Sequence, residues 1–201
     1  MTSTEEPFSN AEDQGGPFER VRITSVDQLQ SKPLSGLFEY WAAKRGSRPY
    51  PGWREFELMV LFEIAPYIHV RDVIDGGAEF TVRFWGTGLT DVLGFEGTGK
   101  QMREIYDGEM LGIALDGFRM VLESAIPVLN KGKVTWVDGK EHRSFHSLVL
   151  PLAAGDGSDG GEGGDGGDGG GGGEGGEGAG GAAAAASAAP SEERIRTMLE
   201  K

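Results

Sequence analysis

Residues 67–85 read YIHVRDVIDGGAEFTVRFW, and this stretch decides the fold class. Polar and apolar residues alternate over Tyr67–Ile74 and again over Glu79–Trp85, which is the two-residue period of β-strands. Asp75-Gly76-Gly77 lies between them and is typical of a tight turn. We therefore predict an antiparallel hairpin whose second strand carries three apolar residues on one face: Phe80, Val82 and Phe84.

The segments on either side of this hairpin predict helices and further strands. Upstream, apolar residues recur at helical spacing over Leu34–Lys44 and Trp53–Ile64. Downstream, a short helix through Asp91–Leu93 and a long helix over Glu109–Ala125 are expected, and three strands follow: Ile126–Leu129, Val134–Val137 and Ser144–Leu152. This order predicts an α+β domain, in which an antiparallel sheet of about five strands carries helices on one face.

Composition separates one folding unit from low-complexity segments. The domain is expected over residues 21–153, including the N-terminal helix, and an acidic disordered tail over residues 1–20. Residues 154–190 are rich in Gly, Asp and Glu and then in Ala, which predicts a disordered insertion. Residues 191–201 fit a short element. Arg194–Leu199 could be an edge strand, or a helix capped by Ser191, and the sequence leaves both open.

The chain is acidic, with 32 Asp and Glu against 19 Lys and Arg, a net charge of −13 over 201 residues. Residues 156–177 hold seven of the acids and no base, so the rest of the chain carries −13 + 7 = −6. This charge repels nucleic acid and anionic membrane surfaces, and we expect neither as a partner.

Other sequence features limit the location and the chemistry. The chain has no cysteine, which excludes disulfides, iron–sulfur clusters and thiol nucleophiles. Its first residues lack the basic and apolar regions of a secretory signal. The longest apolar run, Leu58–Phe62, is too short to span a bilayer. We therefore expect a cytoplasmic protein.

Two consecutive stretches resemble the core of a bacterial PAS-like sensor family. Phe80–Leu89 (FTVRFWGTGL) resembles an arginine-bearing strand that runs into a Gly-Thr turn, and Leu93–Lys100 (LGFEGTGK) resembles the glycine-rich loop that follows it. Tyr40-Trp41 and Leu148–Leu152 resemble the N-terminal helix and the end of the fourth strand of that family. The resemblance covers residues 34–154.

The resemblance implies a non-catalytic sensory or interaction domain that passes its output to a separate signalling protein. The chain departs from the family pattern at two places. Pro51–Phe56 replaces a Pro-x-x-Asp-x-x-Pro pattern, and residues 155–190 replace the tight turn before the fifth strand. The second departure predicts a long insertion in the last hairpin.

We expect six residues to belong either to a ligand pocket or to the structural core: Asp72, Arg83, Trp85, Thr87, Thr98 and Phe118. Arg83 has two interpretations. If its side chain points inward, it needs a carboxylate partner, for which Asp72 on the preceding strand is the candidate. If it points outward, it is an ordinary surface charge.

The sequence does not identify a cofactor. Gly94–Lys100 satisfies G-x-x-x-x-G-K, but Gln101 follows where a phosphate loop needs Ser or Thr. His142 and His146 lack a third metal ligand, so no metal site is predicted. The long helix contains no histidine for haem, whereas non-covalent flavin or a small metabolite remains open.

Three functions fit these observations. The first is a sensor or adaptor, which could self-associate through the apolar stripe of Leu34–Trp41. The second is a small pocket enzyme with an acid–base pair, for which His69 or Arg83 with Asp72 are the candidates. The third is a scaffold domain with a filled core and no ligand.

Overall fold

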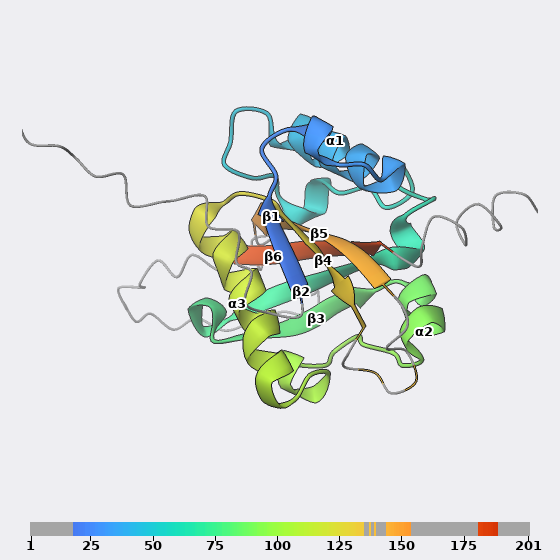
Figure 1. Ribbon diagram of the computed structural model, residues 1–201. Helices are drawn as coiled ribbons and strands as arrows, with labels where there is room; N and C mark the ends of the chain where they lie inside the picture. Colours follow the sequence, from blue (N-terminus) through green and yellow to red (C-terminus); the bar gives the residue numbers. More distant parts are fainter. Residues whose placement is uncertain (1–17, 135–136, 138, 140–143, 154–180, 189–201) are drawn as a thin grey trace, which may run out of the picture.

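The structure is a computed structural model that describes residues 18–134, 137, 139, 144–153 and 181–188. Strands and helices of this part build the expected α+β fold (Figure 1). The α-helices are α1 Lys32–Arg45, α2 Thr87–Leu93 and α3 Gly108–Ser124. The strands are β1 Phe18–Arg22, β2 Ile68–Ile74, β3 Glu79–Trp85, β4 Val128–Lys133, β5 Ser144–Ala153 and β6 Gly181–Ala188.

The strands form one sheet in the order β1-β4-β5-β6-β2-β3, and all neighbours are antiparallel. The predicted hairpin is β2–β3. Its turn holds Asp75, Gly76 and Gly77 at φ values of 48°, 65° and 99°. Glycine adopts this left-handed region without the steric cost of a Cβ atom, which explains the two glycines of the turn.

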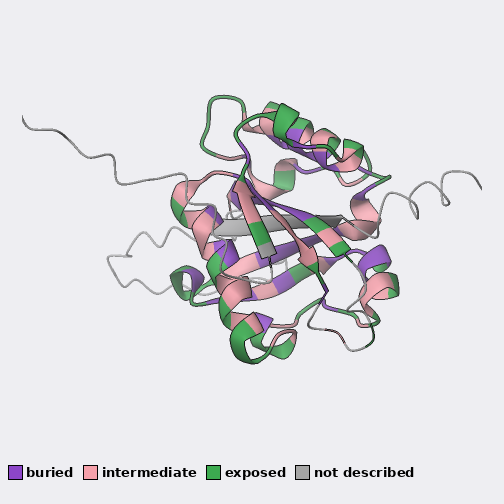
Figure 2. Ribbon diagram, viewed as in Figure 1, coloured by how far each residue is buried: buried purple, intermediate pink, exposed green. Residues whose placement is uncertain are grey.

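Helices cover both faces of the sheet, whereas the sequence predicted helices on one face. Neighbouring side chains of a strand point to opposite faces of the sheet, and β5 packs against helices on both faces. Leu148 and Leu150 pack in the apolar cluster that contains α1, and Val149 packs in the cluster that contains α3. In Figure 2 the exposed residues of α1 and α3 lie on the sides away from the sheet.

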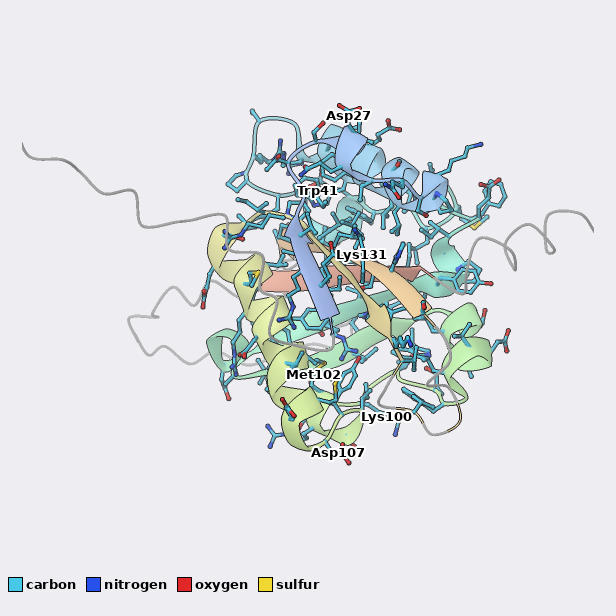
Figure 3. The ribbon with its side chains drawn as sticks, in the orientation of Figure 1. Asp27, Trp41, Lys100, Met102, Asp107 and Lys131 are labelled. Atoms are coloured by element: carbon cyan, nitrogen blue, oxygen red, sulfur yellow. The ribbon has the colours of Figure 1, made fainter. Side chains whose placement is uncertain are left out.

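Helix α1 buries its whole apolar stripe against the sheet. Pro33 stands in its first turn, where a missing N–H costs nothing, and Gly46 ends it at φ 57°. The indole Nε1 of Trp41 donates to the carbonyl of Pro151 at 2.8 Å, and Figure 3 places Trp41 between α1 and the sheet. Because these side chains are buried within the same chain, the stripe does not extend beyond the domain as the self-association hypothesis assumed.

A β-bulge in β3 changes the predicted face of Phe84. Val70 pairs with Phe84 and Arg71 with Val82, so Arg83 is the extra residue. Phe80 and Val82 therefore face α3 and α2, while Phe84 packs in the cluster of α1. The prediction that all three residues share one face was wrong because strict alternation does not hold across a bulge.

The predicted helix Trp53–Ile64 is absent from the structure. A 3₁₀ turn over Trp53–Glu55 is followed by further turns, and Met59, Val60 and Phe62 are exposed. The backbone N–H of Glu57 donates to the Tyr40 hydroxyl at 2.9 Å, so it is not available to a helical carbonyl four residues earlier. A tertiary contact thus overrides the local helical pattern.

Strand boundaries differ from the prediction at three places. Strand β1 begins at residue 18, inside the expected N-terminal tail. The expected strand Ile126–Leu129 is β4, which begins at Val128 and continues to Lys133; Val134 is not in a strand, and residues 135 and 136 of the expected strand Val134–Val137 lie outside the described residues. Strand β6 lies inside the expected disordered insertion, and Arg194–Leu199 lie outside the described residues.

The glycine-rich loop after α2 is hydrogen-bonded to β3. Val82 N–H donates to Lys100 O at 2.9 Å, and Gly99 N–H donates to Val82 O at 2.8 Å. Glu96 accepts from the backbone and the hydroxyl of Thr98 at 2.8 and 2.6 Å. Gly97 touches the indole of Trp85 so closely that a Cβ would lie 2.5 Å from Cε3. The loop is therefore a packing element.

We predict that Gly97→Ala lowers the free energy of unfolding by about 1–3 kcal/mol, the usual cost of overpacking. The matched control is Gly112→Ala on α3, where a Cβ would meet no atom within 4 Å. Alanine is the better helix former, so this control should gain up to about 1 kcal/mol. Urea unfolding measures both values, and equal stability of the two variants would contradict the close contact.

Candidate functional site

A cavity of about 80 Å³ lies between α3 and the sheet. Its wall is formed by β1, β2, β4, β5, α3 and the segment before α3. The lining residues are Arg20, His69, Tyr106, Met110, Ala114, Gly117, Phe118, Asn130, Phe145, Ser147 and Val149. The wall thus combines apolar side chains with five polar ones, a composition typical of small-molecule sites.

Strand β2 carries two buried polar side chains to the α3 side of the sheet. His69 is 7% exposed and Arg71 is 0% exposed. Arg71 Nε donates to His69 Nδ1 at 3.3 Å, Arg71 Nη1 donates to Met102 Sδ at 2.6 Å, and the guanidinium lies 5.2 Å from the centre of the Phe118 ring. Arg71 therefore stands directly behind two residues of the cavity wall, His69 and Phe118.

The buried guanidinium of Arg71 has no ion-pair partner within the part of the chain that the structure describes. Glu79 is near enough to influence its pKa, but the Glu79 carboxylate is occupied elsewhere. A buried charge without a counter-charge costs several kcal/mol. An imidazole nitrogen, a thioether and an aromatic face compensate only part of that cost.

His69 is a neutral imidazole that carries its ring proton on Nε2. Burial and, after it, the Arg71 charge lower its pKa well below the usual 6.5. Since Nδ1 accepts from Arg71, the single ring proton is on Nε2. The ring centre lies 5.8 Å from that of Trp85 and 6.3 Å from that of Phe118, so aromatic contacts fix its orientation.

Arg20 brings a second guanidinium to the cavity from β1. Its Nη2 donates to the carbonyl of Ile113 on α3. The guanidinium lies against Gly117, where an added Cβ would be 3.1 Å from Nη2. Glycine at position 117 thus allows the arginine to lie close to the helix. Tyr106 completes this side of the wall, and burial raises the pKa of its hydroxyl, which stays a neutral donor.

Asn130 of β4 and Ser147 of β5 are paired across the two strands and add polar groups to the wall. The buried Oδ1 of Asn130 has no hydrogen-bond partner among the described residues. An amide can rotate to present either its oxygen or its NH₂ group, so Asn130 can serve an acceptor or a donor of a ligand.

Glu79 holds Met102 in place beneath Arg71. Its carboxylate accepts from the backbone N–H groups of Phe80 and Met102 at 2.8 and 3.0 Å, and from Arg103 Nε at 2.6 Å. Burial alone would raise the pKa of Glu79, but these hydrogen bonds outweigh it and lower the pKa. Figure 3 shows Met102 beside the lower part of α3.

The structure places the six predicted residues in different environments. Of the six, only Phe118 lines the cavity. Trp85 is buried behind the cavity wall, where its ring contacts that of the lining residue His69. Arg83 and Asp72 pair at 2.6 Å on the solvent side, so the pair exists but is not buried. Thr87 and Thr98 are exposed at the start of α2 and in the glycine-rich loop.

The sequence interpretation missed Arg71, Arg20, Tyr106, Asn130 and Ser147. Strand alternation does contain a signal for Arg71, because Ile68 and Val70 on one face leave His69 and Arg71 on the other. The acid–base pair of His69 with Asp72 is not formed, since these side chains lie on opposite faces. His142 lies outside the described residues, and the described part holds no cluster of three potential metal ligands.

Comparison with known proteins supplies one match. A family model described as a PAS domain matches residues 29–160, about two thirds of the chain. Neither the curated proteins nor the solved structures gave a match. Among the described helices, none has the length and apolarity that a membrane span requires.

We predict that the free energy of unfolding falls as the pH decreases from about 6.5 to 5, because the unfolded chain takes up a proton at His69 that the folded protein excludes. The slope contributed by this group approaches about 1.4 kcal/mol per pH unit. His69→Asn should remove that component, which urea unfolding at several pH values measures.

The control is His146→Asn, because His146 is exposed on β5. It should keep the slope of the original protein. An unchanged slope in the His69→Asn variant would show that His69 is not held neutral by the fold.

Proposed function

The chain belongs to the PAS domain family, and from this premise we propose that it is a sensory module which binds a small molecule between α3 and the sheet. We propose further that its output passes to a separate signalling protein. The observation that carries this proposal is the cavity itself, because its wall holds the buried Asn130 Oδ1, which has no hydrogen-bond partner among the described residues, and because the buried charge of Arg71 lies directly behind it. A core of apolar side chains would avoid the free-energy cost of burying polar groups without full hydrogen bonding.

The size of the cavity favours a compact metabolite. A water-sized group needs about 10–15 Å³ of cavity, so 80 Å³ accommodates about five to eight non-hydrogen atoms. Flavin and haem are far larger than this space.

Strand β5 supports a route from the cavity to the surface. Ser147 and Val149 face the cavity, while Leu148 and Leu150 pack in the α1 cluster on the opposite face. The Trp41–Pro151 hydrogen bond connects α1 to the same strand. A ligand that prefers one packing arrangement of β5 would increase the population of that arrangement. Because β5 contacts the cavity on one face and the α1 cluster on the other, the packing of α1 would change with it. The surface of α1 is then the part that a partner reads.

We predict that native mass spectrometry of freshly purified protein detects a retained small molecule. Ala114→Met should abolish this retention, because the longer side chain occupies the cavity. Glu123→Met is the matched control, since it adds the same side chain at an exposed position of α3.

Hydrogen exchange then tests the route. Exchange in α1 should be slower in the loaded protein than in Ala114→Met, and Glu123→Met should resemble the loaded protein. A polypeptide mass alone, together with a melting temperature that does not respond to the small-molecule fraction of a cell extract, would contradict sensing and favour a scaffold.

A further inference from the structure

We propose that the ligand of this cavity is a small carboxylate anion, whose charge is balanced by Arg71 behind the wall and by Arg20 in the wall. This inference rests on the proposed ligand-binding function and specifies the chemical class of the ligand. It starts from the juxtaposition of a cavity with a buried cation that lacks a counter-charge.

The first observation in favour of an anion is the buried charge of Arg71. The side chain is fully buried, and its contacts in the described part of the chain are a neutral imidazole, a thioether and an aromatic ring. Charges in a poorly hydrated interior interact more strongly than in water, so an anion in the adjacent cavity gains substantially from this guanidinium. The anion would supply the counter-charge that Glu79 does not.

The second observation is that several groups of the wall are hydrogen-bond donors. His69 Nε2–H, the Tyr106 hydroxyl, the Ser147 hydroxyl and the Arg20 guanidinium are all able to donate. Carboxylate oxygens accept such bonds, and charge-assisted hydrogen bonds are about twice as strong as neutral ones. His69 has a particular role here, because its Nδ1 accepts from Arg71 while its protonated Nε2 is available to a ligand, so the ring links the buried charge to the cavity.

The third observation is that the described lining residues include no acidic side chain. Within the described residues, no Asp or Glu lines the cavity. Glu19, the neighbour of Arg20 on β1, is directed to an ion pair with Lys131 at 3.3 Å. The net charge of −13 opposes anion binding. Screening over about 8 Å at physiological ionic strength weakens that distant repulsion, whereas the local guanidinium groups act at short range.

The volume limits the anion to a few atoms. Room for about five to eight non-hydrogen atoms suits a two- to four-carbon carboxylic or dicarboxylic acid. Larger anions such as nucleotides do not fit this space. Phosphate fits by size, and the experiment therefore includes it as a competing probe.

The test is calorimetric titration and thermal unfolding with acetate, pyruvate and malonate. Acetamide and malonamide serve as neutral counterparts of nearly the same shape, and inorganic phosphate as an anion without a carboxylate. All probes are used at constant ionic strength. We expect at least one carboxylate to bind at least about tenfold more tightly than its amide and than phosphate, and to raise the melting temperature where the amide does not.

Two substitutions test the charges. Arg20→Gln should weaken binding of the selected carboxylate about 10- to 100-fold, as expected for the loss of a charge-assisted contact. Arg71→Met should reduce the preference for the carboxylate over the amide, and the preference that remains should depend on Arg20. Because it also removes an uncompensated buried charge, the unliganded variant should be at least as stable as the original protein. Arg119→Gln is the control, since Arg119 lies on α3 away from the cavity and bonds to the η4 turn (Asp75–Gly77).

The outcomes separate this inference from the proposed function. Equal binding of a carboxylate and its amide, or tighter binding of phosphate, would overturn the anion class stated here while leaving ligand sensing intact. Binding that is unaffected in both Arg20→Gln and Arg71→Met would also overturn it. If no probe binds and native mass spectrometry finds no retained molecule, the proposed function fails as well.

Discussion

The guanidinium of Arg71 sets requirements that much of the surrounding structure meets. A cation removed from water must be solvated by protein groups. His69, Met102 and Phe118 provide this from β2, the 3₁₀ turn over Met102–Glu104 and α3. Glu79 fixes that turn by accepting hydrogen bonds from the backbone N–H of Met102 and from Arg103 Nε. The sheet, the turn and the long helix are thereby connected around one charge.

Most of the fold could be predicted because local patterns and tertiary packing agree there. Strands β2 and β3 alternate clearly, and the long helix α3 carries apolar residues at helical spacing. The segment Trp53–Ile64 is the opposite case, because it has a helical pattern but its backbone bonds to Tyr40. Strand β6 could not be found from propensity, since alanine favours helix over strand. Backbone pairing with strands on both sides determines its conformation.

The site was harder to predict than the fold because its residues come from segments far apart in the sequence. Arg20 and Asn130 meet at the cavity only because β1 pairs with β4, and β1 was expected to lie largely in a disordered tail. The resemblance directed attention to Arg83 and the glycine-rich loop, which are structural. Arg71 lies in the same hairpin, but alternation alone does not reveal which face of a two-sided sheet borders a cavity.

The position of β6 between β5 and β2 has a consequence for how this domain tolerates change in length. Residues 154–180 connect β5 to β6, and their ends are brought together by a continuous ladder. The entropy of closing such a connection grows only logarithmically, so doubling its length costs about 0.6 kcal/mol. The sheet can therefore retain its topology when this connection is made longer or shorter.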